Sequence, residues 1–307
     1  MSHKSKVSLN EQLRQRLSGC LAIGRSRNLD KRSGIDCKQF IYSWGSYKAY
    51  FKQGKAFIKF CKAKGYKCKT LEDCRQYCDL WLQESIDRGL SAHTLKLYTA
   101  TLSKIYSTSS DAFIKTPTRH RKDITRSRKP AVRDKNFNPE LHQNTINFLL
   151  STGLRRNEAN SLRGLALFVD SDEADGIDGT GPRYKLRITS GSKGGRPREV
   201  LIIGDVDNVV AMMKAAGDGK VFPNKLPANL DVHNLRARHA CLLYKYYHDK
   251  YGGPKDRKDK FFPRGEMAHK AVYSKKLMRL VSEQLGHSRI GIFSSSYAYY
   301  LTQEDLK

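Results

Sequence analysis

The sequence lacks any apolar run that approaches the ~20 residues needed to cross a lipid bilayer. Its first six residues carry positive charge, but no apolar stretch follows them, so a signal peptide is not expected. The 307 residues are 39% hydrophobic, which suffices for about two domains with ordinary cores. We therefore expect a cytoplasmic protein with no membrane partner.

Acidic residues are scarce relative to basic ones. The chain has 30 Asp and Glu against 57 Lys and Arg, which gives a formal net charge of +27. Such an excess creates a positive field that attracts polyanions. Because the basic residues are spread along the chain and no polybasic tail stands out, they favour a protein that wraps nucleic acid over one held at a membrane by a basic patch.

The seven cysteines include no Cys-x-x-Cys pair. Cys74 and Cys78 are four residues apart, a helical spacing, but no clustered histidine or second cysteine pair completes the usual zinc ligands. We therefore expect reduced, mostly buried thiols, no metal and no cofactor.

The first third of the chain is expected to be helical and basic. Residues 1–36 are polar and basic, and we predict a mobile arm or a loosely packed lead-in there, with a short helix near Leu9–Leu17. From residue 37 to residue 110, apolar side chains recur at steps of three and four, which predicts a small all-helical domain. Residues 111–137 contain two prolines and many basic side chains, which is typical of a linker.

A cationic linker between two basic domains is suited to following a phosphate backbone, although a solvated hinge without a ligand would look the same. Two lysines of the helical domain are predicted to face outward and join the linker in this role. The predicted nucleic-acid contacts are Lys96, Lys104, Arg119, Arg121, Lys122, Arg126, Arg128 and Lys129.

The second domain, over residues 138–307, is predicted to be mainly α-helical with a small antiparallel β-sheet. Its patterns indicate a tight turn and a helix over 152–162, an acidic solvated loop over 170–178, and a β-hairpin. The hairpin strands are expected over 184–189 and 198–203, with a glycine-rich turn between them. Further helices are predicted over 139–151, 232–249, 268–285 and 295–305.

Seven residues of this domain have side chains suited to a phosphodiester: Arg155, Glu158, Lys193, His233, Arg236, His287 and Tyr297. Two guanidiniums can bind the non-bridging oxygens of one phosphate and offset the charge of a pentavalent transition state. A tyrosine hydroxyl, with a reference pKa of about 10, needs a cation or a base to attack. A histidine can supply the base, and a lysine can protonate the departing oxygen. No carboxylate cluster suited to Mg²⁺ accompanies them, so the arginines would replace a metal.

Each of these residues alone has an ordinary structural explanation. Arg155 could be a phosphate-positioning or salt-bridge residue, and His233 a hydrogen-bonded structural histidine. Tyr297 could be a core or surface aromatic, and Tyr299 and Tyr300 crowd the same turn. Only the combination of these residues points to phosphodiester chemistry.

The order of the motifs resembles the tyrosine recombinase (phage integrase) family, and within it integrases of mobile elements. The motifs are Thr152-Gly-Leu-Arg155-x-x-Glu158, a hairpin lysine, His233-x-Leu-Arg236, Leu285-Gly-His287 and Tyr297. This resemblance spans about residues 37–307. It implies a helical core-binding domain and an α+β catalytic domain that close as a C-shaped clamp on duplex DNA.

The resemblance also implies a mechanism. Tyr297 would attack the scissile phosphate and form a 3′-phosphotyrosyl link, without metal or ATP. Arg155 and Arg236 would bind the phosphate, Lys193 would be the general acid, and Glu158 would hold the site in register. His233 and His287 would assist proton transfer or hydrogen-bond the phosphate. A monomer would assemble into a tetramer on its recombination sites, with DNA-bending accessory factors as candidate partners, at the nucleoid of a bacterial or archaeal cell.

The sequence departs from the family pattern at three places. Ala237 stands where a histidine usually follows the second arginine, and Tyr297 lies ten rather than nine residues after His287. Only ten residues follow Tyr297, too few for a long C-terminal helix that would be donated to a neighbouring protomer. Other functions stay open at this point. One is a type IB-like topoisomerase or resolvase, which shares the phosphotyrosine chemistry. Another is a DNA-binding regulator with a decayed site, which the charge would suit equally well.

Overall fold

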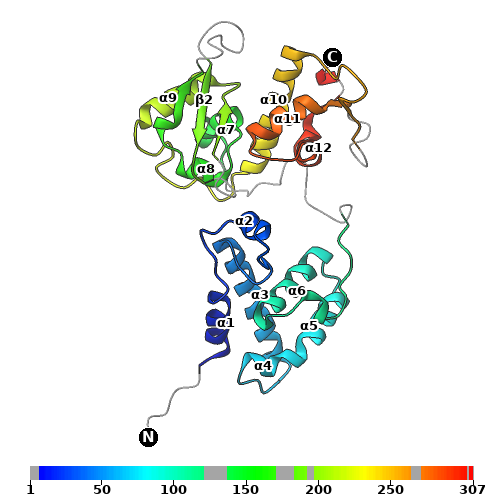
Figure 1. The fold of residues 1–307 in the computed structure, drawn as a ribbon. Coiled ribbons are helices and arrows are strands. Elements are labelled where there is room, and N and C mark those ends of the chain that lie inside the picture. Colours follow the sequence, from blue (N-terminus) through cyan, green and yellow to red (C-terminus); the bar gives the residue numbers. More distant parts are fainter. Residues whose placement is uncertain are drawn as a thin grey trace. The chain divides into compact units, whose positions relative to one another are not determined.

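The computed structural model describes residues 7–120, 137–170, 183–191, 197–263, 271–302 and 304–306. The chain divides into two compact units, Met1–Thr125 and Arg126–Lys307 (Figure 1). Helices predominate and the strands pair antiparallel, which confirms the predicted mainly α fold with a small antiparallel sheet. No helix within the described ranges is long and apolar enough to cross a membrane.

The first unit is a bundle of helices. Its elements are α1 (Leu9–Ser18), α2 (Arg27–Arg32), α3 (Trp44–Ala63), α4 (Leu71–Cys74), α5 (Cys78–Asp87) and α6 (Ala92–Tyr106), with short 3₁₀ turns at Arg75–Tyr77 and Ser110–Ala112. Serines cap α3 and α6, and Thr70 with Asp73 forms a full capping box at α4. Phe57, Trp81 and Leu102 lie in its buried core.

Helix α1 belongs to this core, so the predicted arm over 1–36 is wrong from Leu9 onward. Leu9, Leu13 and Leu17 recur every four residues and are buried. Leu13 packs against Gly54 of α3, where an added Cβ would lie 2.7 Å from a Leu13 methyl carbon. The predicted linker also begins later than expected, because Phe113 and Ile114 pack on the same core. Residues 121–136 lie outside the described part of the chain.

The second unit contains a three-stranded antiparallel sheet in the order β1 (Leu167–Val169), β2 (Tyr184–Ile188), β3 (Arg198–Leu201). The hairpin of β2 and β3 was predicted, whereas β1 was not. In the hairpin Leu186 lies opposite Val200. Asp170, predicted in a solvated acidic loop, is instead buried and pairs with Lys185 Nζ at 2.7 Å. Residues 171–182 of that loop lie outside the description.

This part of the unit also contains three helices: α7 (Gln143–Thr152), α8 (Arg156–Ser161) and α9 (Val206–Ala216). Helix α9 was not predicted from the sequence. A small pair of strands follows α10 (Val232–Tyr251): β4 (Lys260–Phe261) and β5 (Tyr273–Ser274). Then come α11 (Lys275–Gln284), α12 (Gly291–Ser296) and 3₁₀ turns at Ala298–Tyr300 and Glu304–Leu306. Ser274 caps α11, so that helix begins later than the predicted residue 268, and 295–305 is not one helix.

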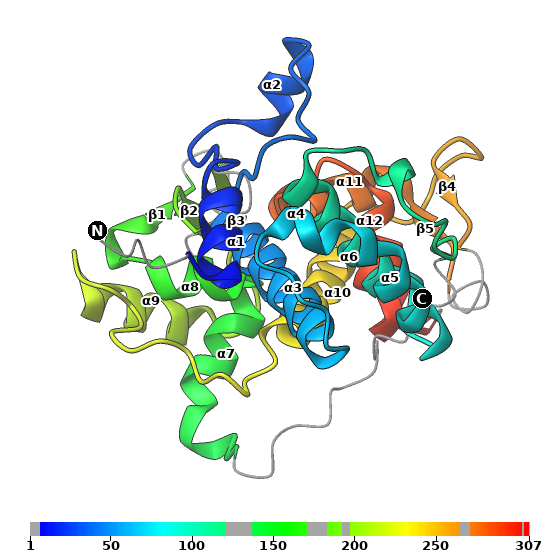
Figure 2. The same cartoon turned by 90° about the horizontal axis from the view of Figure 1, so that it is seen from below.

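Helix α10 joins the two hydrophobic cores of this unit. Val232 and Leu235 pack with the sheet, α7 and α9, whereas Leu243 and Tyr244 pack with α11 and α12. Both views show α10 between these two groups of elements (Figure 1, Figure 2). The residues near its N-terminal end can therefore meet side chains from both groups.

Candidate phosphate-binding site with a tyrosine hydroxyl

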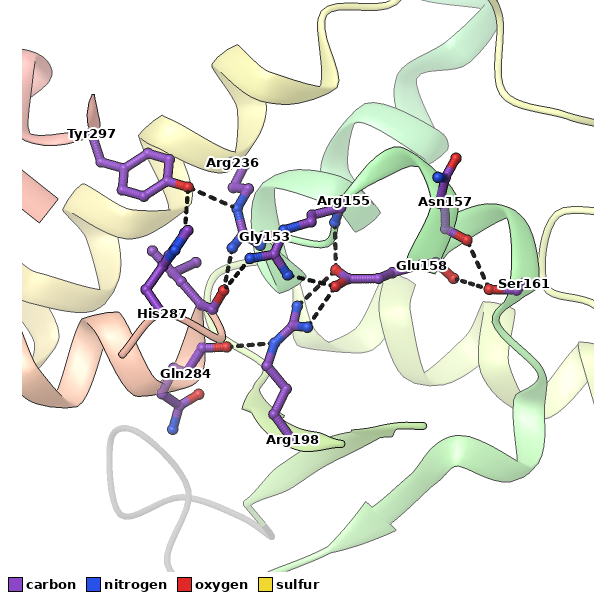
Figure 3. A network of polar contacts seen from close by, with 11 residues as sticks. Gly153, Arg155, Asn157, Glu158, Ser161, Arg198, Arg236, Gln284, His287 and Tyr297 are labelled. Carbon is purple, nitrogen blue, oxygen red and sulfur yellow. Dashed lines mark hydrogen bonds and ion pairs between the residues drawn. The ribbon is translucent and has the colours of Figure 1, made fainter. Parts of the chain in front are cut away.

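The candidate site is built on a buried carboxylate held by two arginines (Figure 3). Glu158 in α8 has no exposed side-chain surface. Arg198 at the start of β3 donates to both of its oxygens, at 2.6 and 2.7 Å. Arg155 donates through its backbone N–H and through Nη1, each at 2.7 Å. The carboxylate thus fixes two guanidiniums from different elements.

The same contacts set the protonation state of Glu158. Burial alone would raise its pKa, but the hydrogen bonds and charges of Arg198 and Arg155 outweigh burial and hold the pKa at about 2. Glu158 is therefore ionised at neutral pH and saturated by its partners. It is not free to serve as a metal ligand or a base.

Arg236 lies deeper, with 2% of its surface exposed. Its guanidinium donates to the carbonyl oxygens of Gly153 and Leu285, and its Nε donates to the Tyr297 hydroxyl at 3.2 Å. Arg155 Nη2 donates to the same Leu285 carbonyl at 2.9 Å, so the two guanidiniums are neighbours. These bonds use three of the five N–H groups of Arg236.

Burial lowers the pKa of Arg236 to about 10, with a contribution from Arg155, while Tyr297 acts in the opposite direction. Arg236 is therefore still a cation at neutral pH. The Arg236 guanidinium contacts the Tyr297 hydroxyl in a buried environment, where electrostatic interactions are stronger than in water.

The Tyr297 hydroxyl lies between Arg236 and His287. His287 Nε2 is 2.9 Å from the phenol oxygen, and Tyr297 is 4% exposed. Because Arg236 already donates to this oxygen, the phenol hydrogen is available for donation to His287. Burial and the charges of the nearby arginines lower the pKa of His287 to about 4, so its imidazole is neutral at pH 7 and can accept that hydrogen.

The extra residue between His287 and Tyr297 does not separate them. Gly286, with φ +67°, ends the turn after α11, and His287 N–H donates to Ser282 O at 2.7 Å. Tyr297 follows α12 directly, and its N–H donates to Phe293 O at 2.9 Å. The neighbouring Tyr300 hydroxyl is directed elsewhere, because it donates to Asn234 Oδ1.

Two of the histidines in α10, His233 and His239, differ in their surroundings. The His233 ring centroid is 5.8 Å from that of Tyr297, and His233 is exposed. His239 is fully buried, its Nδ1 donates to Leu150 O at 2.8 Å, and its Nε2 has no partner among the described residues. Burial lowers the pKa of His239 to about 4, so it is a neutral core residue beneath the site.

The structure therefore brings together Arg155, Glu158, Arg236, His287 and Tyr297, with His233 at the rim. Lys193, the predicted general acid, lies outside the described residues, as do Arg121, Lys122, Arg126, Arg128 and Lys129. Lys96 and Arg119 are exposed. Lys104, predicted to face outward, is 7% exposed and donates to the carbonyls of Lys38 and Phe40, so it is structural.

Arg198 is the important residue that the sequence analysis missed. Side chains alternate across a strand, so Arg198 lies on the same face of β3 as buried Val200. An arginine on the inward face of a strand needs a buried partner, and this was the available signal. Its Nε donates to Gln284 O at 2.8 Å, which ties β3 to α11 as well as to α8.

Two solved structures, of a recombinase and of an integrase, align with most of the chain. XerA recombinase is 14% identical, with 95% of this chain and 96% of that chain covered and a TM-score of 0.30. The Tn1549 transposon integrase in complex with transposon right end DNA is 13% identical, with 92% and 97% covered and a TM-score of 0.41. No protein-family model and no curated protein matches the chain.

Proposed function

We propose that the protein is a site-specific DNA recombinase of the tyrosine type, with Tyr297 as its nucleophile. The observation that carries this proposal is the position of the Tyr297 hydroxyl, hydrogen-bonded to a buried arginine and to a neutral histidine. A phenol in that setting can lose its proton to His287 while Arg236 stabilises the oxygen's developing charge.

The bonding changes balance without a further reactant. The Tyr297 oxygen forms a bond to phosphorus as the bond to the 5′ oxygen breaks, which leaves a 3′-phosphotyrosyl link and a 5′-hydroxyl. Lys193 is proposed to give the leaving oxygen its proton. A 5′-hydroxyl from a partner strand then attacks the phosphotyrosine, and this restores the phenol.

Arg155 and Arg236 are proposed to bind the scissile phosphate. They share the Leu285 carbonyl, and each retains N–H groups for a further acceptor. A phosphodiester there would gain charge-assisted hydrogen bonds that strengthen as its charge grows in the transition state. Glu158 and Arg198 would hold Arg155 in place and stay off the phosphate.

The first unit offers a surface for the DNA backbone. Five exposed lysines repeat at steps of four and three along α3, and we call them the lysine row: Lys48, Lys52, Lys55, Lys59 and Lys62. This spacing keeps them on one side of the helix over about 21 Å. The lysine row replaces Lys104 as the proposed contact in this unit, alongside Lys96.

The proposed biological role is integration or excision of a mobile element by a tetramer that acts on paired sites. Pairs of protomers would cut and exchange strands in turn, through a Holliday junction. Energy conserved in the phosphotyrosine bond would make ATP unnecessary.

A nicked DNA substrate tests the chemistry. A nick just beyond the cleavage position lets the short 5′-hydroxyl fragment diffuse away, so the covalent adduct accumulates and is seen as a DNA-dependent shift on a denaturing gel. Tyr297→Phe should abolish the adduct and Tyr300→Phe should retain it. An adduct formed by Tyr297→Phe would refute the assignment of the nucleophile. Relaxation of supercoils without paired sites would indicate a topoisomerase instead, and binding without any adduct a regulator.

A further inference from the structure

Three cysteine thiols converge in the first unit, far from the tyrosine in the chain. Cys61 lies in the last turn of α3, Cys68 in the following loop and Cys74 in α4. Their sulfur atoms all lie within 4.8 Å of one another. Cys61 and Cys74 are buried and Cys68 is half-buried, so the group reaches from the core to the surface. Cys78, one helical turn after Cys74, is not part of it.

The backbone holds the loop that carries Cys68. Gly65 ends α3 at φ +76°, Tyr66 N–H donates to Cys61 O at 3.0 Å, and Cys68 N–H donates to Tyr66 O at 2.9 Å. The Tyr66 ring stacks on that of Tyr77 with centroids 3.7 Å apart. Cys61 and Cys68 are thus fixed relative to each other by one tight turn.

The segment that carries Cys74 is anchored from another helix. The Gln12 side chain of α1 donates to Lys69 O at 3.0 Å and accepts from Leu71 N–H at 3.1 Å. The Asp73 carboxylate accepts the N–H groups of Lys69 and Thr70 at 2.8 and 2.9 Å. These contacts preorganise the three thiols before any ligand is present, which is what a tight site requires.

We propose that Cys61, Cys68 and Cys74 bind one thiophilic divalent metal ion of the Zn²⁺ class through their thiolates. Zinc–sulfur bonds are about 2.3 Å long, so two sulfurs on one tetrahedral ion lie about 3.8 Å apart. The sulfur atoms, which lie within 4.8 Å of one another, need to approach by about 1 Å at most to reach this spacing. The half-buried position of Cys68 leaves the fourth place open to water.

The surrounding charge suits this occupant. Three thiolates and a divalent cation carry a net charge of −1, and each thiol must release its proton for the ion to bind. Exposed lysines flank the site on both sides of Cys68 and offset that charge: Lys62, Lys67 and Lys69. A soft thiolate set also selects zinc over Mg²⁺ or Ca²⁺.

The spacing explains why the sequence analysis expected no metal. Six residues separate Cys61 from Cys68 and five separate Cys68 from Cys74, neither of which matches a Cys-x-x-Cys pair. The site exists because Cys74 of α4 lies beside Cys61 at the end of α3. Its function would be to fasten the loop between them.

The test uses the full-length protein, reduced and freed of metal with a chelator, and titrated with Co²⁺ alone. We expect one Co²⁺ per chain, a sulfur-to-cobalt charge-transfer absorption and release of about three protons at a pH where the thiols are protonated. Alkylation followed by peptide mapping should show Co²⁺-dependent protection of Cys68, the half-buried thiol of the three, but no protection of half-buried Cys20 and Cys37, which serve as internal controls.

Variants add a second line of evidence. Cys68→Ser should weaken Co²⁺ binding at least tenfold and Cys37→Ser should leave it unchanged. The proposal is overturned if the charge-transfer band is absent, if protection falls on other cysteines, or if the two variants bind Co²⁺ equally well. Proton release and protection in the unaltered protein decide the matter even if Cys68→Ser fails to fold. These results do not affect the proposal that Tyr297 forms a phosphotyrosyl link, which the nicked DNA substrate tests independently.

Discussion

Replacing Arg198 by methionine should destabilise the second unit, because it removes the bidentate partner of a carboxylate that has no exposed surface. Breaking a buried ion pair by removing one partner costs about 3–5 kcal/mol, since the other charge stays buried. Arg155 still holds Glu158 through two bonds, which places the expected loss near the lower end of that range, at about 3 kcal/mol.

The pKa of Glu158 points in the same direction. Burial would raise it, but Arg198 and Arg155 together lower it from 4.5 to about 2 on folding, so the ionised carboxylate stabilises the fold. Because the folded pKa is lowered, this stability is present above pH 4.5 and is lost as the pH falls toward 2. In Arg198→Met the pKa should rise, so the loss of stability with acid over this pH range should become smaller.

Urea unfolding separates the two units. Both tryptophans, Trp44 and Trp81, lie in the first unit, so tryptophan fluorescence follows that unit while far-ultraviolet circular dichroism follows both. Arg198→Met should shift the dichroism transition of the second unit and leave the fluorescence transition in place.

A matched control lies on the neighbouring strand. Arg187 pairs with Glu199 at 3.4 Å, but its side chain is 62% exposed, so Arg187→Met should cost less than about 1 kcal/mol. If Arg198→Met costs no more than Arg187→Met, the buried carboxylate is not held as we describe. The double variant Arg198→Met with Glu158→Gln should recover part of the loss, because a neutral amide then replaces the buried carboxylate that has lost Arg198.

Four further outcomes are expected. Gly153→Ala should lower the unfolding free energy by about 2 kcal/mol or more, because φ is +58° and the new Cβ would overlap the His239 ring; it should also slow adduct formation through the Arg236 contact. Replacing the middle three lysines of the lysine row by alanine should reduce the slope of log DNA affinity against log salt concentration by about 0.9 per lost phosphate contact. Lys104→Met should leave that slope unchanged and lower the thermal midpoint of the first unit. His287→Gln should slow adduct formation by about 10²-fold or more in single-turnover assays, whereas an unchanged rate would exclude it as the base.

Local spacing allowed part of the site to be predicted. Arg155 and Glu158 are three residues apart at the start of a short helix, so their contact follows from helix geometry and from the turn at Gly153. The hairpin was likewise predictable, because its two strands flank a glycine-rich turn. Helix α10 is present where a helix over 232–249 was predicted.

Contacts between distant segments could not be predicted in this way. Nothing near Lys104 in the sequence indicates that two carbonyls more than sixty residues away would bury its ammonium group. Likewise, nothing near Arg198 in the sequence indicates that it would pair with Glu158, forty residues away. Nor does the sequence indicate that the thiols of Cys61, Cys68 and Cys74 would lie together.

The sequence by itself determined the chemical types of the site residues, their order along the chain and the large positive charge. The tertiary structure decided which of them meet. The ten-residue step from His287 to Tyr297 left the phenol's place open, since chain spacing does not fix a distance across a turn and a short helix. Packing of Tyr297 against α10 sets the hydroxyl 2.9 Å from His287 Nε2 and 3.2 Å from Arg236 Nε.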